Sequence, residues 1–400
     1  MTTATAEGLA VREATDDDWP AIADLRDLAF RFRGTRERLL PGMWLVTERA
    51  VVVGCGRLQV AAQWFGGRAL PTGMVSSVAV APEARGRGVS RALIRALLEQ
   101  ARAAGCVGVS LYPSALQPYR RAGFAVAGTH LTARLRFGSI VPAGPATVER
   151  FDGDLAGLMS QYSHWAATTE GGLERSEEWW RERVLSSDPP TPHDADDGAP
   201  HAYVVRDRDG IVAHVVYSQR AQAGANYLAE LACRSLAWET PEAGRALLGF
   251  LASGQPLTTA MTWAASAVDP VGAFVDAQPQ IVSSLPWMHR LVDPAAAIGG
   301  RTYPELTRTG LEIRVEDPFI PDWSVTLSIA IEDGAARVEA TQATSARAAP
   351  IRVDVLGAIL AGGLHPLDAA RLGWLPDEPP ILGGLIALAP SRRRWIGDTF

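Results

Sequence analysis

The stretch Arg85-Gly86-Arg87-Gly88 combines the residue types that bind a diphosphate. The two glycines let backbone N–H groups approach phosphate oxygens, and the arginines, with Arg91, supply positive charge. A helix is expected to begin directly after the turn, with the positive end of its dipole toward the ligand. The spacing matches neither the P-loop nor the dinucleotide fingerprint. The alternative interpretation is a tight loop with solvated arginines, but three guanidinium groups across one turn repel each other without an anion.

The elements around this turn predict an α/β unit over residues 1–147. A hairpin is expected over 44–64, interrupted by Gly54 and Gly56, and residues 73–82 predict the strand before the turn. Residues 107–113 predict another strand, followed by a short helix and a last strand. The helix after the turn is expected to end near Gly105, and its apolar face holds Val89, Ala92, Leu93, Ala96 and Leu97.

A weak internal repeat follows within residues 148–298. Residues 202–218 predict a hairpin with Asp209-Gly210 at its turn, and a strand, a helix over 241–253 and a further strand come after it. Where the first copy has ARGRGVS, this copy has AWETPEAGR. We therefore predict a structural copy that lacks the diphosphate ligand.

Residues 299–400 predict a third domain of the α+β class. Strands are expected over 306–318, 323–341 and 349–360, and helical segments around 354–375 and 381–390. The chain ends in RRRWIGDTF. The whole chain is thus expected to form two tandem α/β domains and an α+β domain.

Composition excludes several other classes of protein. A net charge of −6 argues against a nucleic-acid partner, which requires a basic face. No apolar run reaches the ~20 residues of a membrane span, and the N-terminus lacks the features of a signal peptide, so a cytoplasmic protein without a membrane partner is expected. Cys55, Cys106 and Cys233 have neither disulfide nor zinc spacing and are expected to be buried free thiols.

No metal is predicted. The alternative is a metal site in the loop 186–201, which is rich in proline and aspartate and is expected to be disordered. Its possible ligands are His193, Asp194, Asp196, Asp197 and His201. An unanchored loop must be ordered before it can bind a metal ion, which makes this site the weaker interpretation.

Together these residues resemble a known family. The run Arg85 to Ser90 is similar to the pyrophosphate-binding loop of the GNAT superfamily, Q/R-x-x-G-x-G/A, with Ser90 departing at the last place. The segments VAVAP, SALQPYRRAGF and WMHRLVDPAAAIGGRTYP resemble the Eis (enhanced intracellular survival) branch of N-acetyltransferases. This resemblance implies two GNAT-like domains, the second degenerate, a sterol-carrier-protein-like C-terminal domain, a homo-hexamer, and acetyl-CoA as co-substrate.

The resemblance also implies which residues form the site. The cofactor-binding residues are Val78, Ala79 and Val80 for the pantetheine arm, Arg85, Gly86, Arg87, Gly88, Val89, Ser90 and Arg91 for the diphosphate, and Ser114 and Ala115 beside the cofactor. Tyr119 matches the general acid that protonates the departing thiolate, with a core tyrosine as the alternative. The Phe400 carboxylate matches the general base, with a frayed terminus as the alternative.

The expected reaction is transfer of an acetyl group to a primary amine of a small molecule. Aminoglycosides, the substrates of well-known relatives, are a poorer match, because Arg31 and Thr399 stand where the relatives have acidic residues. Asp27, Glu37 or Asp398 could compensate for this loss of negative charge. The alternatives are multi-site aminoglycoside acetylation, transfer of longer acyl chains, and a non-catalytic protein that binds acyl-CoA or lipid.

Overall fold

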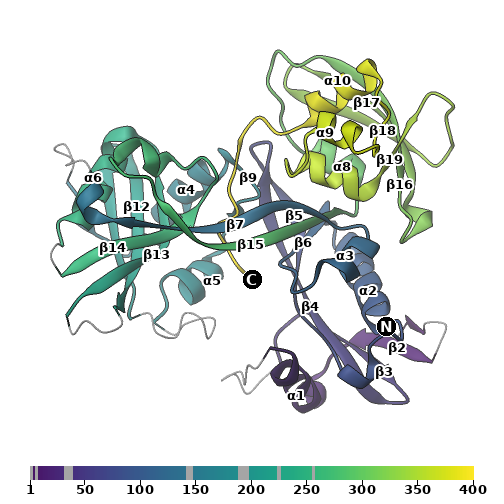
Figure 1. Cartoon of the computed structure of the whole chain (residues 1–400), viewed down its shortest axis with the longest axis horizontal. Coiled ribbons are helices and arrows are strands. Elements are labelled where there is room, and N and C mark those ends of the chain that lie inside the picture. Colours follow the sequence, from purple (N-terminus) through teal and green to yellow (C-terminus); the bar gives the residue numbers. More distant parts are fainter. Residues whose placement is uncertain are drawn as a thin grey trace. The chain divides into compact units, whose positions relative to one another are not determined.

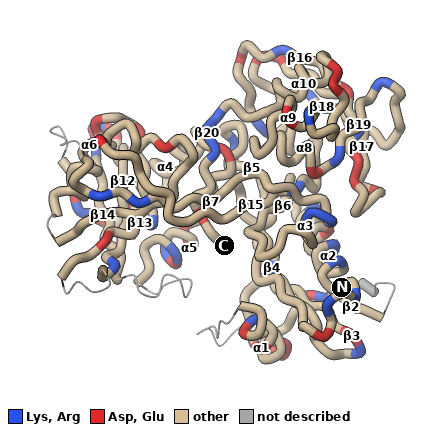
Figure 2. Tube along the Cα trace, in the orientation of Figure 1, with Lys and Arg blue, Asp and Glu red and all other residues tan. Residues whose placement is uncertain are grey.

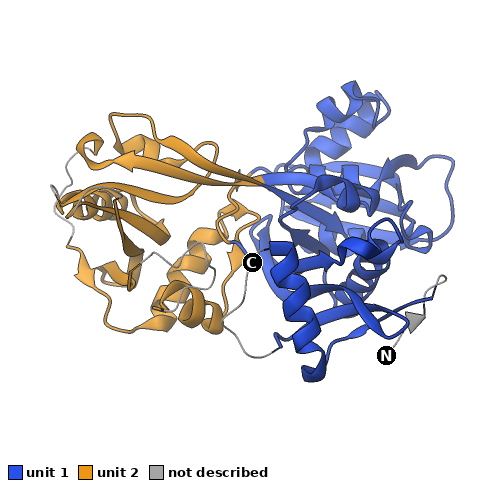
Figure 3. Ribbon diagram, turned by 60° about the horizontal axis from the view of Figure 1, so that its bottom comes forward, with its two compact units in different colours: residues 1–128, 286–391, 399–400 blue, residues 129–285, 392–398 orange. Residues whose placement is uncertain are grey.

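The computed structural model describes most of the chain (Figure 1). The described residues are 3–4, 8–30, 39–140, 147–187, 198–222, 227–254 and 257–400. No helix among them is long and apolar enough to cross a membrane. The chain divides into two compact units (Figure 3), of which unit 1 comprises 1–128, 286–391 and 399–400, and unit 2 comprises 129–285 and 392–398.

The first part of unit 1 is a twisted sheet with helices packed on it. Its antiparallel strands, in sheet order, are β1 (Thr3–Ala4), β2 (Leu9–Glu13), β3 (Met43–Glu48), β4 (Val51–Phe65) and β5 (Arg68–Val80). The next strand, β6 (Gly108–Leu111), pairs in parallel with β5. The helices are α1 (Trp19–Phe30), α2 (Val89–Ala103) and α3 (Leu116–Arg121), with short 3₁₀ turns at Asp16–Asp18 and Pro82–Ala84.

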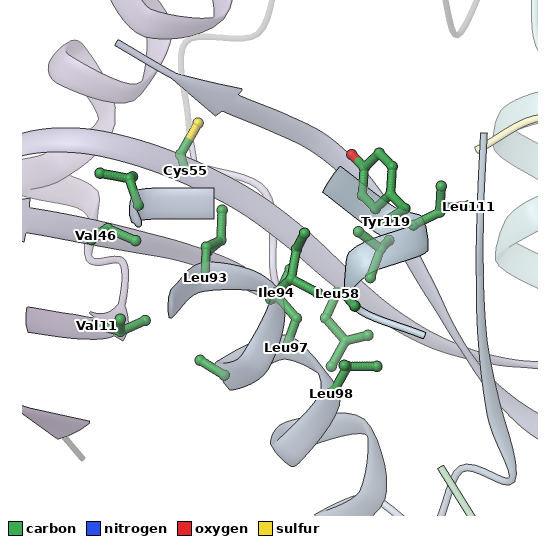
Figure 4. Packing of buried hydrophobic residues seen from close by; sticks show 14 of the residues in the cluster. Val11, Val46, Cys55, Leu58, Leu93, Ile94, Leu97, Leu98, Leu111 and Tyr119 are labelled. Atoms are coloured by element: carbon green, nitrogen blue, oxygen red, sulfur yellow. The ribbon is translucent and has the colours of Figure 1, made fainter. Parts of the chain in front are cut away.

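Helix α2 packs closely on β4 because two strand residues there are glycines. A Cβ on Gly54 would lie 2.7 Å from Val89, and one on Gly56 would lie 3.2 Å from Leu93. The predicted interruption of the hairpin at these glycines is therefore wrong, because β4 runs through both. The predicted apolar face of α2 is confirmed: Figure 4 shows Leu93, Ile94 and Leu97 of α2 packed among the side chains of the core.

A strand from much later in the chain completes the sheet of unit 1. The last residues of β15 (Gln280–Leu291) pair antiparallel with β6, from Met288 opposite Leu111 to Leu291 opposite Gly108. No local pattern predicts this pairing, because it joins residues about 180 positions apart.

The third region of the chain also lies in unit 1. Its sheet has the order β18 (Ala335–Thr341), β17 (Val325–Glu332), β16 (Thr309–Glu316), β19 (Ala349–Arg352). Its helices are α7 (Pro294–Gly299), α8 (Val353–Leu360), α9 (Pro366–Arg371) and α10 (Pro379–Leu388), with a 3₁₀ turn at Pro321–Trp323. The predicted strand over 349–360 is half wrong: it ends at Arg352, and the wholly apolar second half forms the buried helix α8.

Unit 2 repeats the layout of the first copy. Its sheet has the order β7 (Ala125–Arg136), β14 (Thr258–Ala265), β13 (Ala229–Trp238), β12 (Gly210–Ala221), β11 (His201–Asp207), β8 (Glu149–Arg150). Its helical segments are α4 (Leu155–Ala166), α5 (Glu177–Trp179), α6 (Pro241–Ala252), a π-helical turn at Trp180–Val184, and 3₁₀ turns at Phe137–Ser139 and Pro270–Phe274. The short strands β9 (Thr169–Glu170) and β10 (Leu173–Glu174) follow α4, and β9 pairs in parallel with β20 (Arg393–Arg394).

The predicted repeat is confirmed by its elements. Strands β11 and β12 form the expected hairpin, with Asp207 paired to Gly210 across the turn. Strand β13, helix α6 and strand β14 follow, and β13 and β14 pair in parallel as β5 and β6 do. The sequence-based boundaries at residues 147 and 298 stay a prediction.

Candidate active site

The site is built where strands β5 and β6 part. Four residue pairs join the strands, from Thr72 opposite Gly108 to Val75 opposite Leu111, and β5 then continues to Val80 while β6 ends. The positive φ of Ser77, 54°, and a register shift in the β4–β5 pairing accompany this change of direction.

Residues 78–80 therefore lie on β5 past its last pair with β6. One edge of this segment pairs with β4: Val80 pairs with Gly54, and Ala79 pairs with Cys55. Among the described residues, no strand pairs with the opposite edge of this segment. Backbone groups on an unpaired edge are available to an extended ligand, as the pantetheine prediction requires.

The loop at the N-terminus of α2 is open. Gly86 has a φ of +77°, and a Cβ placed on it would meet no atom within 4 Å. Helix α2 begins after Gly88, whose φ is 81°, and no side chain caps it. Its first N–H groups are thus left for a ligand, and they carry the positive end of the helix dipole.

The corresponding helix of the second copy is closed. Thr240 caps α6, its Oγ1 accepting a hydrogen bond of 3.3 Å from the N–H of Ala243. The first helical residue is Pro241, which has no N–H to offer. A side chain here fills the place that a phosphate would take, which supports the prediction that this copy lacks the diphosphate ligand.

Two of the three arginines, Arg87 and Arg91, have partners within the protein. Arg87 forms an ion pair of 2.9 Å with Glu48, and the guanidinium of Arg91 lies 5.3 Å from the ring centre of Phe319. Glu48 therefore offsets the charge of one of the three cations, and the expected repulsion among them stays a prediction. Figure 2 shows the basic positions along α2, and Arg85 is exposed.

Tyr119 lies in α3, beyond the end of β6. Its side chain is buried, and its ring meets Phe124 edge-on at 5.9 Å. Figure 4 shows the Tyr119 side chain next to Leu111, and among the described residues its hydroxyl has no hydrogen-bond partner. Burial raises the pKa of Tyr119 to about 12, so the phenol is protonated at neutral pH and can donate a hydrogen bond.

The segment before Tyr119 faces solvent. Ser114 and Ala115 are exposed, and Ala115 is the N-cap of α3 in an extended conformation. At the other end of α3, the buried Arg290 donates a hydrogen bond to the carbonyl of Ala122 and pairs with Asp317. Sequence analysis did not single out Arg290, although it lies in the WMHRL segment that carries the resemblance.

Phe400 lies at the end of β6. Its ring contacts the ring of Tyr112, the residue after β6, at a centroid distance of 5.3 Å. Phe400 is half-buried, which does not match the alternative of a frayed terminus. Tyr112 was not predicted as a site residue, and its position directly after the β6 strand is the signal that could have found it.

Two other predictions concern acidic residues. Asp398 does not offer a free carboxylate, because it forms a buried ion pair of 2.9 Å with Arg175. Asp27 lies half-buried in α1. Arg31 and Glu37 lie outside the described residues, and Thr399 is exposed.

The thiols and the possible metal ligands are accounted for as follows. All three cysteines are free, Cys55 and Cys106 buried and Cys233 half-buried, and burial raises the pKa of each thiol. His193, Asp194, Asp196 and Asp197 lie outside the described residues. Within the described part of the chain, no group of three possible metal ligands comes together.

Comparison with known families agrees with this geometry. Residues 10–127 match a GNAT acetyltransferase domain, residues 171–291 match a second one, and residues 294–397 match a sterol carrier protein domain. These matches make the chain an acyltransferase of the GNAT superfamily. No curated protein sequence matches the chain.

Solved structures share the same fold along nearly the whole chain, which is Eis-like in its domain order. A GCN5-related N-acetyltransferase from Anabaena variabilis is 19% identical, with a TM-score of 0.86 over 98% of this chain and 100% of that one. One from Kribbella flavida is 23% identical, with a TM-score of 0.80 over 98% and 100%. Eis1 from Mycobacterium abscessus is 21% identical, with a TM-score of 0.78 over 98% and 100%. The predicted fold class is confirmed.

Proposed function

We propose that the chain is an acetyl-CoA-dependent N-acetyltransferase that acetylates a primary amine of a small molecule. One observation carries the proposal: the ring of Phe400 rests on Tyr112, where β5 and β6 part. The chain terminus, the open edge of β5 and the helix that carries Tyr119 therefore belong to one unit.

The loop and strand residues bind the co-substrate. The diphosphate lies against the N–H groups of residues 86–91 at the open end of α2, with Arg85 exposed nearby as a cation. The pantetheine arm runs along residues 78–80, where β6 no longer pairs with β5, and Ser114 and Ala115 lie beside the arm. The alternative is an enzyme that transfers longer acyl groups. Comparing turnover of acetyl-, propionyl- and octanoyl-CoA distinguishes the two.

The reaction needs a base and an acid. The Phe400 carboxylate removes a proton from the ammonium form of the acceptor, and the neutral nitrogen attacks the thioester carbonyl. When the carbonyl re-forms, the C–S bond breaks and the electron pair leaves on sulfur. Tyr119 then donates its hydroxyl proton to the thiolate, and the proton that the attacking nitrogen loses as it becomes an amide restores the phenol. An α-carboxyl with a pKa of ~3.3–3.7 in water becomes a stronger base when it is desolvated.

The acceptor carries fewer positive charges than an aminoglycoside. Asp398 is neutralised by Arg175, and Thr399 supplies no charge where relatives have an acidic residue. A polycation would therefore meet fewer carboxylates beside Phe400 than the relatives provide. We therefore expect a monoamine, an aromatic amine or an amino group on a natural product to be a better acceptor than a polycation.

Adding one glycine after Phe400 tests the base. The addition displaces the carboxylate by about 3.5 Å, so we expect kcat to fall at least 100-fold while calorimetry shows unchanged binding of acetyl-CoA. The control is the same glycine added before Met1. Full activity of the C-terminally extended chain would show that the Phe400 carboxylate is not the base. If the wild type bound no acetyl-CoA, the proposed function itself would be wrong.

A non-catalytic acyl-CoA-binding protein is the second candidate. The contrast between the open N-terminus of α2 and the capped N-terminus of α6 favours a working site, because a site that has lost its ligand is filled, as at Thr240. The predicted homo-hexamer remains a prediction, and light scattering of the purified protein tests it.

A further inference from the structure

The second copy has its own parting of strands. Four residue pairs join β13 and β14, from Ala229 opposite Thr258 to Ala232 opposite Thr262. Beyond these pairs β13 continues to Trp238 and β14 to Ala265. This arrangement corresponds to that of β5 and β6, where the first copy is proposed to hold the pantetheine arm.

Aromatic side chains and the end of the chain fill this place in unit 2. Only a small cavity is left between them, and the lining residues that matter here are Trp165, Trp238, Trp263, Ala264, Arg393 and Trp395. Two of these belong to the C-terminal tail, residues 392–398. A segment of the protein itself thus lies at the place that corresponds to the proposed ligand site of the first copy.

Trp395 makes the central contacts of the tail. Its indole Nε1–H donates a hydrogen bond of 2.9 Å to the carbonyl of Ala264 in β14. Its ring meets the ring of Trp165 edge-on at 4.6 Å, and its side chain is buried. The guanidinium of Arg393 also packs on Trp165, 5.6 Å from the centre of its ring.

The tail is fixed on both sides of this ring. The backbone N–H of Trp395 donates a hydrogen bond of 3.0 Å to the backbone carbonyl of Glu170, and Nδ1 of His130 lies 2.7 Å from the carbonyl of Ile396. Burial lowers the pKa of His130, so the ring is neutral and Nδ1 carries the proton of this bond. Two residues before the terminus, both carboxylate oxygens of Asp398 accept hydrogen bonds from the Arg175 guanidinium.

We propose that the parted strands of the second GNAT domain form the anchor of the C-terminal tail, and that Trp395 is a positioning residue for the Phe400 carboxylate. This inference rests on the proposed function. Five peptide bonds separate Trp395 from Phe400, and an unanchored tail of that length would spread the carboxylate over many positions. Holding the tail removes that freedom before the substrate binds, as a base needs.

Two variants and a matched control test the anchor. Trp395→Ala removes the ring, and Trp395→Phe keeps a ring but removes the hydrogen bond to Ala264. Trp263→Phe is the control, because Trp263 lines the same cavity and also donates an indole hydrogen bond, at 3.3 Å to Asp269, but is not part of the tail.

The first readout needs no catalysis. Carboxypeptidase removes an aromatic terminal residue only when the tail detaches, so we expect Trp395→Ala to release Phe400 at least 10-fold faster than the wild type. Trp395→Phe is expected to lie between the two, and Trp263→Phe to match the wild type. Equal release from Trp395→Ala and wild type, in samples whose thermal unfolding shows a folded chain, overturns the anchor.

The second readout is the kinetic split. We expect Trp395→Ala to lower kcat by roughly 10- to 100-fold with KM for acetyl-CoA within twofold, because the base is displaced and the co-substrate site is not. Unchanged kcat overturns the positioning role. If the wild type acetylates no amine while Phe400 release still rises, the proposed function fails and takes the catalytic role of Trp395 with it, but the anchor stands.

Discussion

At the scale of single residues, the site has one donor in a defined state. Tyr119 is buried, its pKa is raised to about 12 by burial, and its hydroxyl has no partner in the described part of the chain. A phenol in that state keeps its proton through the whole range in which the acceptor amine loses its own. Tyr119 therefore remains a donor at every pH at which the enzyme can be assayed.

Replacing Tyr119 with phenylalanine removes only this donor. We expect kcat to fall by about 100-fold with little change in KM for acetyl-CoA, since general acids contribute ~10²–10⁴-fold. Tyr303→Phe is the matched control: Tyr303 is equally buried, at 7% exposure, and its hydroxyl bonds the carbonyl of Ile298 in the third domain. Stopped-flow measurement of thiol release checks this, and equal rates for Tyr119→Phe and Tyr303→Phe would show that Tyr119 only packs.

Residue-level prediction from sequence depended on local motifs. The 85–91 loop was predicted from its own residue types, and Tyr119 from a resemblance carried by its neighbours in sequence. Both assignments stay predictions. Arg175 and Asp398 were not found as a pair, since 223 positions separate them. The sequence shows two charges there, and only the fold shows that they neutralise each other.

At the scale of elements, the difference between the two copies lies at a helix N-terminus. Helix α2 starts after a glycine with a positive φ and without a side-chain cap, whereas α6 starts with a threonine cap and a proline. The same strand–turn–helix unit is thus open in one copy and closed in the other. The short runs ARGRGVS and AWETPEAGR predicted a difference at this place, because a helix start depends on local residue types.

Gly86→Ala tests the open end of α2. The substitution strains a backbone with φ of +77° by about 1 kcal/mol and adds a methyl group where the diphosphate is expected, so KM for acetyl-CoA should rise at least 10-fold. Gly105→Ala is the control, because Gly105 has the same φ of +77° and the same open surroundings at the other end of α2. Calorimetric titration with CoA checks both variants, and equal affinities would place the diphosphate elsewhere.

Element types were largely predictable, but their pairing was not. Residues 280–291 form a strand whose second half completes the sheet of the first unit, and nothing in their local pattern specifies β6 as the partner. The glycines at 54 and 56 were misread for a related reason. These glycines allow α2 to pack closely on β4. From sequence alone, a glycine required by such a tertiary contact cannot be told from a glycine that ends a strand.

At the scale of the whole molecule, each unit contains a buried neutral histidine. His214 hydrogen-bonds Gln161 and Ser235 in unit 2, and His289 hydrogen-bonds Ser110 in unit 1. Burial, with a smaller effect of a nearby arginine, lowers the pKa of each to about 3, from an ordinary value of 6.5. Below pH 6.5 the unfolded chain therefore binds protons that the folded chain does not.

This difference makes stability depend on pH. Each histidine stabilises the fold fully above pH 6.5, and its contribution falls by about 1.4 kcal/mol per pH unit down to pH 3. We expect the free energy of unfolding in urea to be several kcal/mol lower at pH 4.5 than at pH 7.5. The variants His214→Gln and His289→Gln should each flatten the curve, and a wild-type stability that is constant from pH 7.5 to 4.5 would contradict the two buried neutral rings.

The most direct test of the account is acetyl transfer itself, measured as acetyl-CoA consumption against a broad panel of amines with mass-spectrometric identification of each product. The chain contains no lysine, so apart from its N-terminus it offers no primary amine that could consume the thioester. We predict turnover of at least one class of monoamine that exceeds turnover of kanamycin-like polycations, and loss of that turnover in the chain extended after Phe400. Binding of acetyl-CoA without transfer to any amine, or faster turnover of the polycations than of every monoamine, would contradict the account.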